Sequence, residues 1–263
     1  MTALTTVFCA VWSGDPDRAD LLAGHIETLR RQSTPVEVLY VFDNDDIPPP
    51  GTPGRHIVSR EPLTIYQAWS LAVRHSETDY VMNLNLDDRL APDAVETMQS
   101  FALANDAGLV GGDWYLRYTQ PETDNTKETY AASLLPFDPA WPPHPGAETR
   151  LGSGTGDRGT LGPATLWNRR LHDQAPYPWQ FADGSPIRIV GDLAWWTIVR
   201  KHLGAPVVRL PIVIGNYHSH PREQAEFRGA DEHQLLSSQG IQMSWYPLRD
   251  VSVLGDNMDA ETT

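Results

Sequence analysis

The feature of this sequence that most constrains its fold is a regular alternation of short apolar runs with helix-forming segments before Tyr118. Short runs rich in β-branched and aromatic residues predict buried strands, and the segments between them predict helices. The expected strands are Thr5–Trp12, Val36–Asp43, Arg55–Arg60, Tyr80–Leu86 and Ala107–Tyr118. The expected helices are Pro16–Arg31, Thr64–His75 with Thr64 as its N-cap, and a helix that begins near Pro92. This order predicts an α/β fold with a mostly parallel sheet flanked by helices.

The alternation stops after Tyr118. From Thr119 to Thr160 the chain is dense in Pro, Gly and polar residues, which predicts a long irregular stretch that is a functional loop, a lid or disordered. Pro163–Leu171 fits either a strand or a short helix. Beyond it we expect a helix at Gly191–Gly204, extended chain at Pro206–His220 and a surface helix at Glu223–Gln239. The expected organisation is one domain over residues 1–250, with halves at 1–118 and 119–250 and a flexible tail at 251–263 as a C-terminal extension.

The composition excludes several classes of protein. A net charge of -14 argues against a nucleic-acid partner and against docking on anionic lipid, since both need a basic surface. The single cysteine, Cys9, cannot form an internal disulfide and lies in an apolar run, where a small buried residue is expected. There is no basic N-terminal flank and no apolar run of the ~20 residues that a membrane span needs. We therefore expect a cytoplasmic protein without an integral membrane segment.

Polar side chains follow several of the expected strands. Trp12 ends the first, Asp43 the second, and Asn85, Asp87 and Asp88 follow a third. Ligands of open parallel sheets bind at the carboxyl ends of the strands. Neighbouring carboxylates repel each other unless a cation lies between them, and hard divalent cations take oxygen ligands. A metal site is one interpretation; the other is that the aspartates only shape the turn before the next helix.

Two further candidates lie towards the C-terminus. His218 and His220 are two residues apart, so on extended chain they share one face, where they fit a metal site as well as two surface histidines. Asp192 lies where a helix is expected to begin and is followed by Trp195 and Trp196. It is either an N-cap or, if partly buried, a carboxylate with a raised pKa that can act as a general base.

In this order the motifs resemble glycosyltransferase family 2, whose members have the GT-A fold. The resemblance lies in "VFDNDD" at the end of the second strand, "YQAWSLAVRHSETDYVMNLNLDDRL", "GDLAWWTIVR" and "YHSHP". These elements occur in the family's order and span most of the chain. Three positions depart from the family pattern: Asn85 stands in place of its usual first Asp, Ser70 in place of a frequent Asn, and Gly191 in place of a Glu.

The resemblance implies a role for each candidate. Ala10, Trp12 and Asp43 would bind the nucleotide of a UDP- or dTDP-sugar donor. Asn85 and Asp87 would form the two ends of the DxD element and, with His220 or His218, hold Mn²⁺ or Mg²⁺ against the diphosphate. Asp88 would lie beside the donor sugar. Asp192 would deprotonate a hydroxyl of a carbohydrate or other acceptor, and the displacement would be inverting.

Other functions of such a fold stay open. A nucleotidyltransferase that makes nucleotide sugars usually has a Gly-rich, basic loop after the first strand, which "WSGDPDR" matches poorly. A non-catalytic sugar- or nucleotide-binding module would not need Asp192. A metal-dependent hydrolase using Asp87, Asp88 and the histidines would turn over without an acceptor.

Overall fold

The computed structural model describes residues 4–118, 149–150, 164–219, 230–249 and 251–254. The strands are β1 (Thr5–Val11), β2 (Glu37–Phe42), β3 (Arg55–Ser59), β4 (Tyr80–Asn83), β5 (Arg89–Leu90), β6 (Leu109–Tyr118), β7 (Thr149–Arg150), β8 (Leu166–Asn168), β9 (Val207–Ser219) and β10 (Val251–Leu254). The helices are α1 (Arg18–Arg30), α2 (Ile65–His75), α3 (Ala94–Asn105), α4 (Arg170–Gln174), α5 (Gly191–Lys201) and α7 (Ala230–Ser238). Every strand and helix expected up to Tyr118 is confirmed, and Pro163–Leu171 contributes both a strand and the start of a helix.

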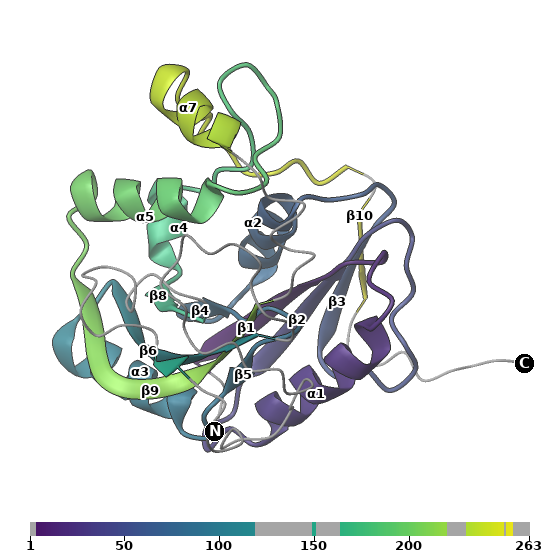
Figure 1. Cartoon of the computed structure of the whole chain (residues 1–263), viewed down its shortest axis with the longest axis vertical. Coiled ribbons are helices and arrows are strands. Elements are labelled where there is room, and N and C mark those ends of the chain that lie inside the picture. The colour runs from purple at the N-terminus through teal and green to yellow at the C-terminus, as the bar shows by residue number, and fades with distance from the viewer. Residues whose placement is uncertain (1–3, 119–148, 151–163, 220–229, 250, 255–263) are drawn as a thin grey trace, which may run out of the picture.

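The strands form a mixed sheet around a parallel centre (Figure 1). Its order is β10-β3-β2-β1-β4-β8-β6-β9-β5, with β7 paired to β6. β1 pairs in parallel with β2 and β4, and β2 pairs in parallel with β3. β8, β5 and β10 join antiparallel to their neighbours. The α/β class predicted from the sequence is confirmed, and the antiparallel strands make the sheet more mixed than the alternation alone indicates.

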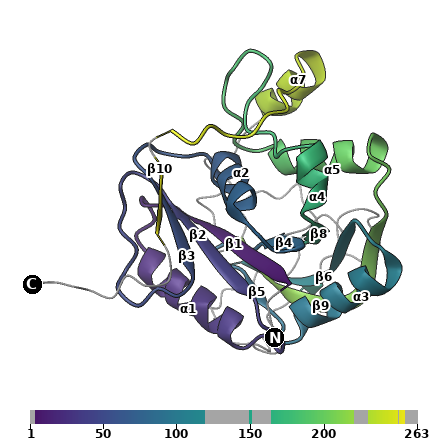
Figure 2. The same cartoon turned by 180° about the vertical axis from the view of Figure 1, so that it is seen from behind.

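Helices cover both faces of the sheet. α1 and α3 lie on one face, and α2, α4 and α5 lie on the other (Figures 1 and 2). Side chains of β1 alternate between them: Phe8 packs with α2 and α5, whereas Val7 packs with α3 and Cys9 packs with α1. Because these strands are buried on both faces, they are continuous apolar runs in the sequence.

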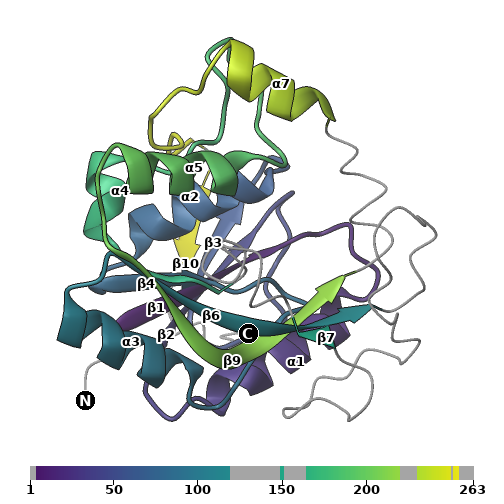
Figure 3. The same ribbon diagram turned by 60° about the vertical axis from the view of Figure 1, so that its left-hand side comes forward.

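α2 and α5 begin at the residues that the sequence predicted. The Thr64 hydroxyl accepts a hydrogen bond from the backbone N–H of Gln67, whose side chain accepts one from the N–H of Thr64. This capping box confirms Thr64 as the N-cap of α2. α5 begins at Gly191 as expected and ends at Lys201, before the Gly204 that the sequence suggested as its end. α7 lies beyond α5, on the same side of the sheet (Figure 3).

The C-terminal segment corrects one expectation. Residues 251–263 were expected to be a flexible tail, but Val251–Leu254 form β10, which pairs antiparallel with β3 through Ser59 to His56. In the sequence, the alternating Val251-Ser252-Val253 pattern is too short to predict a strand. The strand forms because the edge of β3 is available to pair with it. Most of the expected lid, Thr119–Thr160, lies outside the described residues. No helix in the described part of the chain is long and apolar enough to cross a bilayer.

Candidate active site at the carboxyl edge of the sheet

Asp43 joins the loops that follow three parallel strands. One of its carboxylate oxygens accepts a hydrogen bond from the backbone N–H of Ser13, and the other accepts one from the N–H of Leu63, both at 3.2 Å. The side chain is buried, so these two bonds fix it at the strand ends. A carboxylate has about four lone-pair sites, which leaves acceptor capacity for a ligand. Asp43 therefore lies where the sequence predicted, and it also ties the rim together.

The other two candidates for nucleotide binding differ in exposure. Trp12, directly after β1, is 51% exposed. Its indole lies over Gly14, where an added Cβ would meet the ring at 2.6 Å. Ala10 is partly buried within β1 and packs against the core shared with α2. Of the two, Trp12 is the one that offers an aromatic surface at the rim.

The Asn85–Asp88 turn follows β4 beside β1. The N–H of Leu84 donates to the carbonyl of Phe8, and the N–H of Asp88 closes the turn by donating to Asn85. Asn85 is partly exposed, Asp87 is 8% exposed and Asp88 is fully buried. Of the two carboxylates, Asp87 therefore has the greater access to a ligand in this structure.

A buried arginine, Arg89, holds this turn against α1 through hydrogen bonds. Arg89 donates from Nη1 to the carbonyls of Leu86 (2.9 Å) and Asp88 (2.7 Å), and from Nη2 to the carbonyl of Leu21 on α1 (3.4 Å). A Cβ on Gly24 of α1 would lie 2.3 Å from Nη2, so the glycine makes room for the guanidinium. Burial lowers the pKa of Arg89 to about 10, while the charges of Asp87 and Asp88 oppose that shift. Arg89 therefore stays cationic at neutral pH.

A neutral histidine on α1, His25, also contacts the chain that leads into this turn. His25 on α1 is fully buried; its Nε2 lies 3.2 Å from the carbonyl of Leu84 and its Nδ1 lies 2.9 Å from the hydroxyl of Tyr40. Burial lowers the pKa of His25 to about 3, with Arg89 acting in the same direction. A neutral ring must donate from Nε2 to the carbonyl, so it accepts from Tyr40. No local pattern in the sequence predicts that His25, Gly24 and Arg89 pack together, because their burial depends on how α1 lies against the turn after β4.

Asp192 lies in the first turn of α5 but is not its N-cap. The cap residue is Val190, which has no capping side chain. Oδ1 of Asp192 accepts a 2.6 Å bond from the N–H of Leu193 and lies 3.1 Å from the hydroxyl of Tyr66. That hydroxyl donates to the carbonyl of Ile189 at 2.6 Å. Burial raises the pKa of Asp192 to about 6, although both hydrogen bonds act to lower it.

Tyr66 also explains why Gly191 precedes Asp192. A Cβ at Gly191 would lie 2.6 Å from the Tyr66 ring, so any larger side chain would displace that ring. The Glu that family 2 usually has at this position would not fit here without moving Tyr66. Asp192 is therefore left as the carboxylate at the start of α5. Trp195, three residues later, belongs to the core: it is fully buried and stacks on His172 with ring centroids 4.4 Å apart.

The three carboxylates reach the same edge of the sheet. The backbone N–H that Asp43 binds belongs to Leu63, three residues before Tyr66, and Tyr66 contacts Asp192. The turn that holds Asp87 follows β4, the parallel neighbour of β1 on its other side. The carboxyl ends of parallel strands are where ligands of such sheets bind. That Asp43, Asp87 and Asp192 form one site stays a prediction.

The histidines are only partly described. His218 is on β9, and its backbone pairs with Arg117 of β6. β9 pairs antiparallel with β5 at Asn216 and Arg89, and this pairing does not extend to His218 or Asp87. His220 lies outside the described residues. Within the described residues, no group of three or more His, Cys, Asp or Glu side chains forms a metal site.

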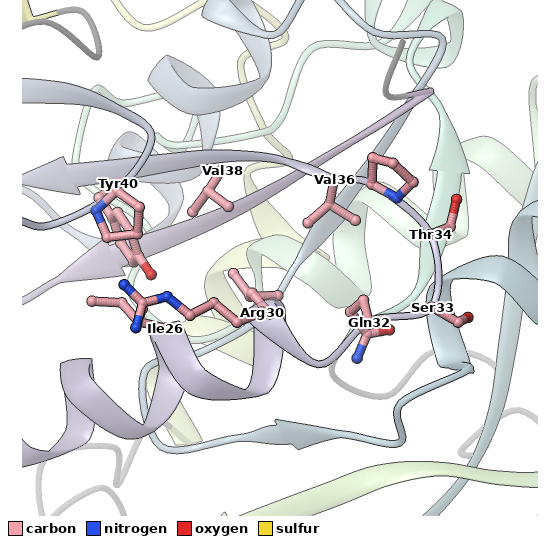
Figure 4. Close-up of a pocket in the computed structure, with 11 residues that line it drawn as sticks. Ile26, Arg30, Gln32, Ser33, Thr34, Val36, Val38 and Tyr40 are labelled. Carbon is pink, nitrogen blue, oxygen red and sulfur yellow. The ribbon is translucent and has the colours of Figure 1, made fainter. Parts of the chain in front are cut away.

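A cavity among the described residues lies away from this edge of the sheet. It has a volume of about 350 Å³ and is lined by the end of α1, residues 32–36 and the first half of β2, with Val36, Val38 and Arg30 around it (Figure 4). These residues lie at the amino end of β2, whereas Asp43 follows its carboxyl end. The cavity is therefore not part of the candidate site.

A model of glycosyl transferase family 2 matches residues 17–174, more than half of the chain. The chain belongs to this family. No curated protein sequence matches it. The match covers the rim residues Asp43, Asn85, Asp87 and Asp88, but not Asp192 or the histidines.

Several solved structures share this architecture. S. aureus TarS (residues 1–349, in complex with UDP-GlcNAc) is similar with a TM-score of 0.53 at 11% identity, over 82% of this chain and 58% of TarS. The mannosyltransferase PcManGT of Pyrobaculum calidifontis, in complex with GDP-Man and Mn²⁺, is similar with a TM-score of 0.51 at 13% identity, over 82% and 57%. A mycobacterial protein gives 0.52 at 15% identity, over 84% and 69%. The chain thus spans less than two thirds of TarS and PcManGT, and at these identities the likeness concerns the fold.

Proposed function

We propose that the protein is an inverting glycosyltransferase that moves a sugar from a nucleotide diphosphate sugar to an acceptor hydroxyl. The observation that carries this proposal is the position of Asp192, a partly buried carboxylate at the sheet edge where Asp43 and Asp87 lie. A general base works best when its pKa is near the operating pH. With a pKa of about 6, Asp192 is ionised at neutral pH and still basic enough to accept a proton.

In the proposed reaction, Asp192 takes the proton of the acceptor hydroxyl. The hydroxyl oxygen forms a bond to the anomeric carbon while the bond from that carbon to the diphosphate oxygen breaks. The electron pair leaves with the nucleoside diphosphate, and attack from the opposite face inverts the configuration. Tyr66 orients Asp192 through Oδ1, which leaves Oδ2 for the acceptor.

The donor side would be held by the residues around Asp43 and Asp87. Asp43 and Trp12, with Ala10 in β1, would bind the nucleoside. Asp88 was expected beside the donor sugar, but its side chain is fully buried, so it would support the turn that carries Asp87 instead. The donor set fits a hard divalent cation, because one accessible carboxylate and an amide oxygen leave room for phosphate oxygens in the shell. We propose that Asn85, Asp87 and His218 or His220 hold Mn²⁺ or Mg²⁺. When bound, such a cation stabilises the charge that develops on the leaving diphosphate.

For the nucleotide and the acceptor, we propose a chemical class and not a single compound. The resemblance to the family favours a UDP- or dTDP-sugar, while the similar structures of TarS and PcManGT are complexes with UDP-GlcNAc and GDP-Man. The acceptor is a carbohydrate or another hydroxyl compound, and the proposed location is the cytoplasm. An experiment must therefore include all three nucleotides.

Thermal unfolding with UDP, dTDP and GDP, each with and without Mn²⁺ or Mg²⁺, tests donor binding, because a ligand of the native state raises Tm. We expect one nucleotide to raise Tm only with metal, and the corresponding sugar donor to release nucleoside diphosphate when glycoside acceptors are added. Asp87→Ala should abolish the metal-dependent shift, whereas Asp93→Ala, a nearby exposed carboxylate, should retain it. A chain that responds to no nucleotide would contradict the proposal. Donor cleavage that never yields a glycoside would favour a hydrolase.

A further inference from the structure

The segment before Asp192 is bound by a carboxylate from a distant helix. Glu232 on α7 accepts hydrogen bonds from three successive backbone N–H groups, those of Arg188 (2.9 Å), Ile189 (2.8 Å) and Val190 (3.2 Å). Hydrogen bonds to an ionised acceptor are about twice as strong as neutral ones. Val190 has no capping side chain from its own segment. Glu232 therefore fixes the backbone that leads into α5.

The opposite side of this segment is held by Tyr66. Its hydroxyl donates to the carbonyl of Ile189, and its ring packs against Gly191 so closely that a Cβ there would lie 2.6 Å away. The peptide before Asp192 is thus held from α7 through its N–H groups and from α2 through its carbonyl. Of these two contacts, only Tyr66 reaches the Asp192 carboxylate itself. The described hydrogen bonds of Glu232 are to the backbone before Asp192 and not to its carboxylate.

We propose that Glu232 is a positioning residue for catalysis, which holds Asp192 at the place where it meets the acceptor hydroxyl and makes α7 a functional part of the site. This inference rests on the proposed function of Asp192. A displacement of about 1 Å in a catalytic group can cost about 10²-fold in rate. Loss of Glu232 should therefore lower kcat and leave donor binding intact, since Asp43 and Asp87 do not contact α7 in the hydrogen bonds described.

Three variants of the full chain test this. In Glu232→Gln one oxygen still accepts while the amide nitrogen cannot, so we expect kcat to fall about tenfold; Glu232→Ala should lower it about 10²-fold. Gln234→Ala, an exposed position on the same helix, should keep wild-type kcat. The Tm shift given by donor nucleotide and metal should be the same in all three. Equal kcat in Glu232→Ala and wild type, or a lost nucleotide shift in Glu232→Gln, would overturn the inference.

A double-mutant cycle separates positioning from general destabilisation. If Glu232 acts through Asp192, then adding Glu232→Ala to Asp192→Asn should lower the residual rate by less than twofold. The same 10²-fold loss in both backgrounds would overturn the inference. A different result would contradict the proposed function itself: wild-type transfer in the single variant Asp192→Asn. Amide exchange at Arg188, Ile189 and Val190 supplies a readout without turnover: it should be faster in Glu232→Gln and unchanged in Gln234→Ala.

Discussion

The turn that carries Asp87 and the turn that carries Asp192 face the same sheet edge but are held by different kinds of contact. The Asp87 turn is held from within the core by the fully buried guanidinium of Arg89, which donates to the carbonyls of Leu86 and Asp88 in the turn and of Leu21 on α1. The Asp192 turn is held by side chains far away in the sequence: Tyr66 is 126 residues from Asp192, and Glu232 is 42 residues from Val190. Changes on the first side should therefore cost stability and donor binding, and changes on the second side should cost rate.

The largest expected effect is on the second side. Asp192→Asn should lower the rate of sugar transfer by about 10²–10⁴, as the loss of a general base does. Donor binding, measured as a nucleotide-dependent Tm shift, should stay near normal. Because burial disfavours the charge of Asp192, the variant should also unfold at a higher temperature than the wild type at neutral pH. Asp173→Asn, an exposed carboxylate, is the control and should change neither. Comparable turnover in Asp192→Asn would reject the assigned role.

On the first side, Arg89→Met should cost about 3–5 kcal/mol of unfolding free energy, because it leaves buried carboxylates and carbonyls without their cation. The matched control is Arg31→Met, which removes an exposed ion pair with Glu27 and should cost at most about 1 kcal/mol. Urea unfolding of both variants measures the difference. Similar losses for the two arginines would show that the Asp87 turn does not depend on its buried support.

Two glycines allow a direct test of the comparison. Gly24→Ala would push a methyl group into Arg89, and Gly191→Ala would push one into the Tyr66 ring; each should cost about 1–3 kcal/mol by overpacking. Their functional effects should differ. Gly24→Ala should weaken metal-dependent nucleotide binding, whereas Gly191→Ala should lower kcat at unchanged nucleotide affinity. Titration of nucleotide and metal, followed by steady-state kinetics, would contradict the comparison if both variants lost the same step.

The smallest expected effect is on pH dependence. With a pKa of about 6 for Asp192, the rate should fall about tenfold per pH unit below 6 and level off above it. The free energy of unfolding should change in the opposite direction to the rate, and should fall as pH rises. The folded pKa lies above the ordinary value of 3.8, so the stabilisation by the protonated form is complete below 3.8 and is lost as pH rises through about 6. Asp192→Asn should remove both dependences, and pH profiles of kcat/KM and Tm measure them. A wild-type profile that is flat near pH 6 would contradict the raised pKa.

Much of the donor side could be predicted from the sequence. Asp43, Asp87 and Asp88 come directly after apolar runs, so their place at the carboxyl edge follows once those runs are parallel strands. Their support could not be predicted in the same way. Arg89 looks like any charged residue beside a turn, and its burial depends on the space left at Gly24 of α1. The fully buried state of Asp88 also depends on this packing.

The surroundings of Asp192 were less predictable. The sequence left Asp192 as an N-cap or a base; the structure excludes the N-cap, because the cap residue is Val190, and the role as a base stays a prediction. Glu232 lies in a stretch expected to be a surface helix, and its three backbone partners precede a different helix. The strand Val251–Leu254 was missed for a similar reason, since it exists through pairing with the edge of β3.

The sequence by itself determined the order of strands and helices and the carboxylates at the strand ends. Apolar periodicity is a local property, and parallel strands deliver their ends to one edge. The tertiary structure alone decided which distant side chains hold those carboxylates and how strongly each is buried. Contacts such as Glu232 with the start of α5 depend on distances in space, and burial, which sets the pKa of Asp192, depends on everything packed around it.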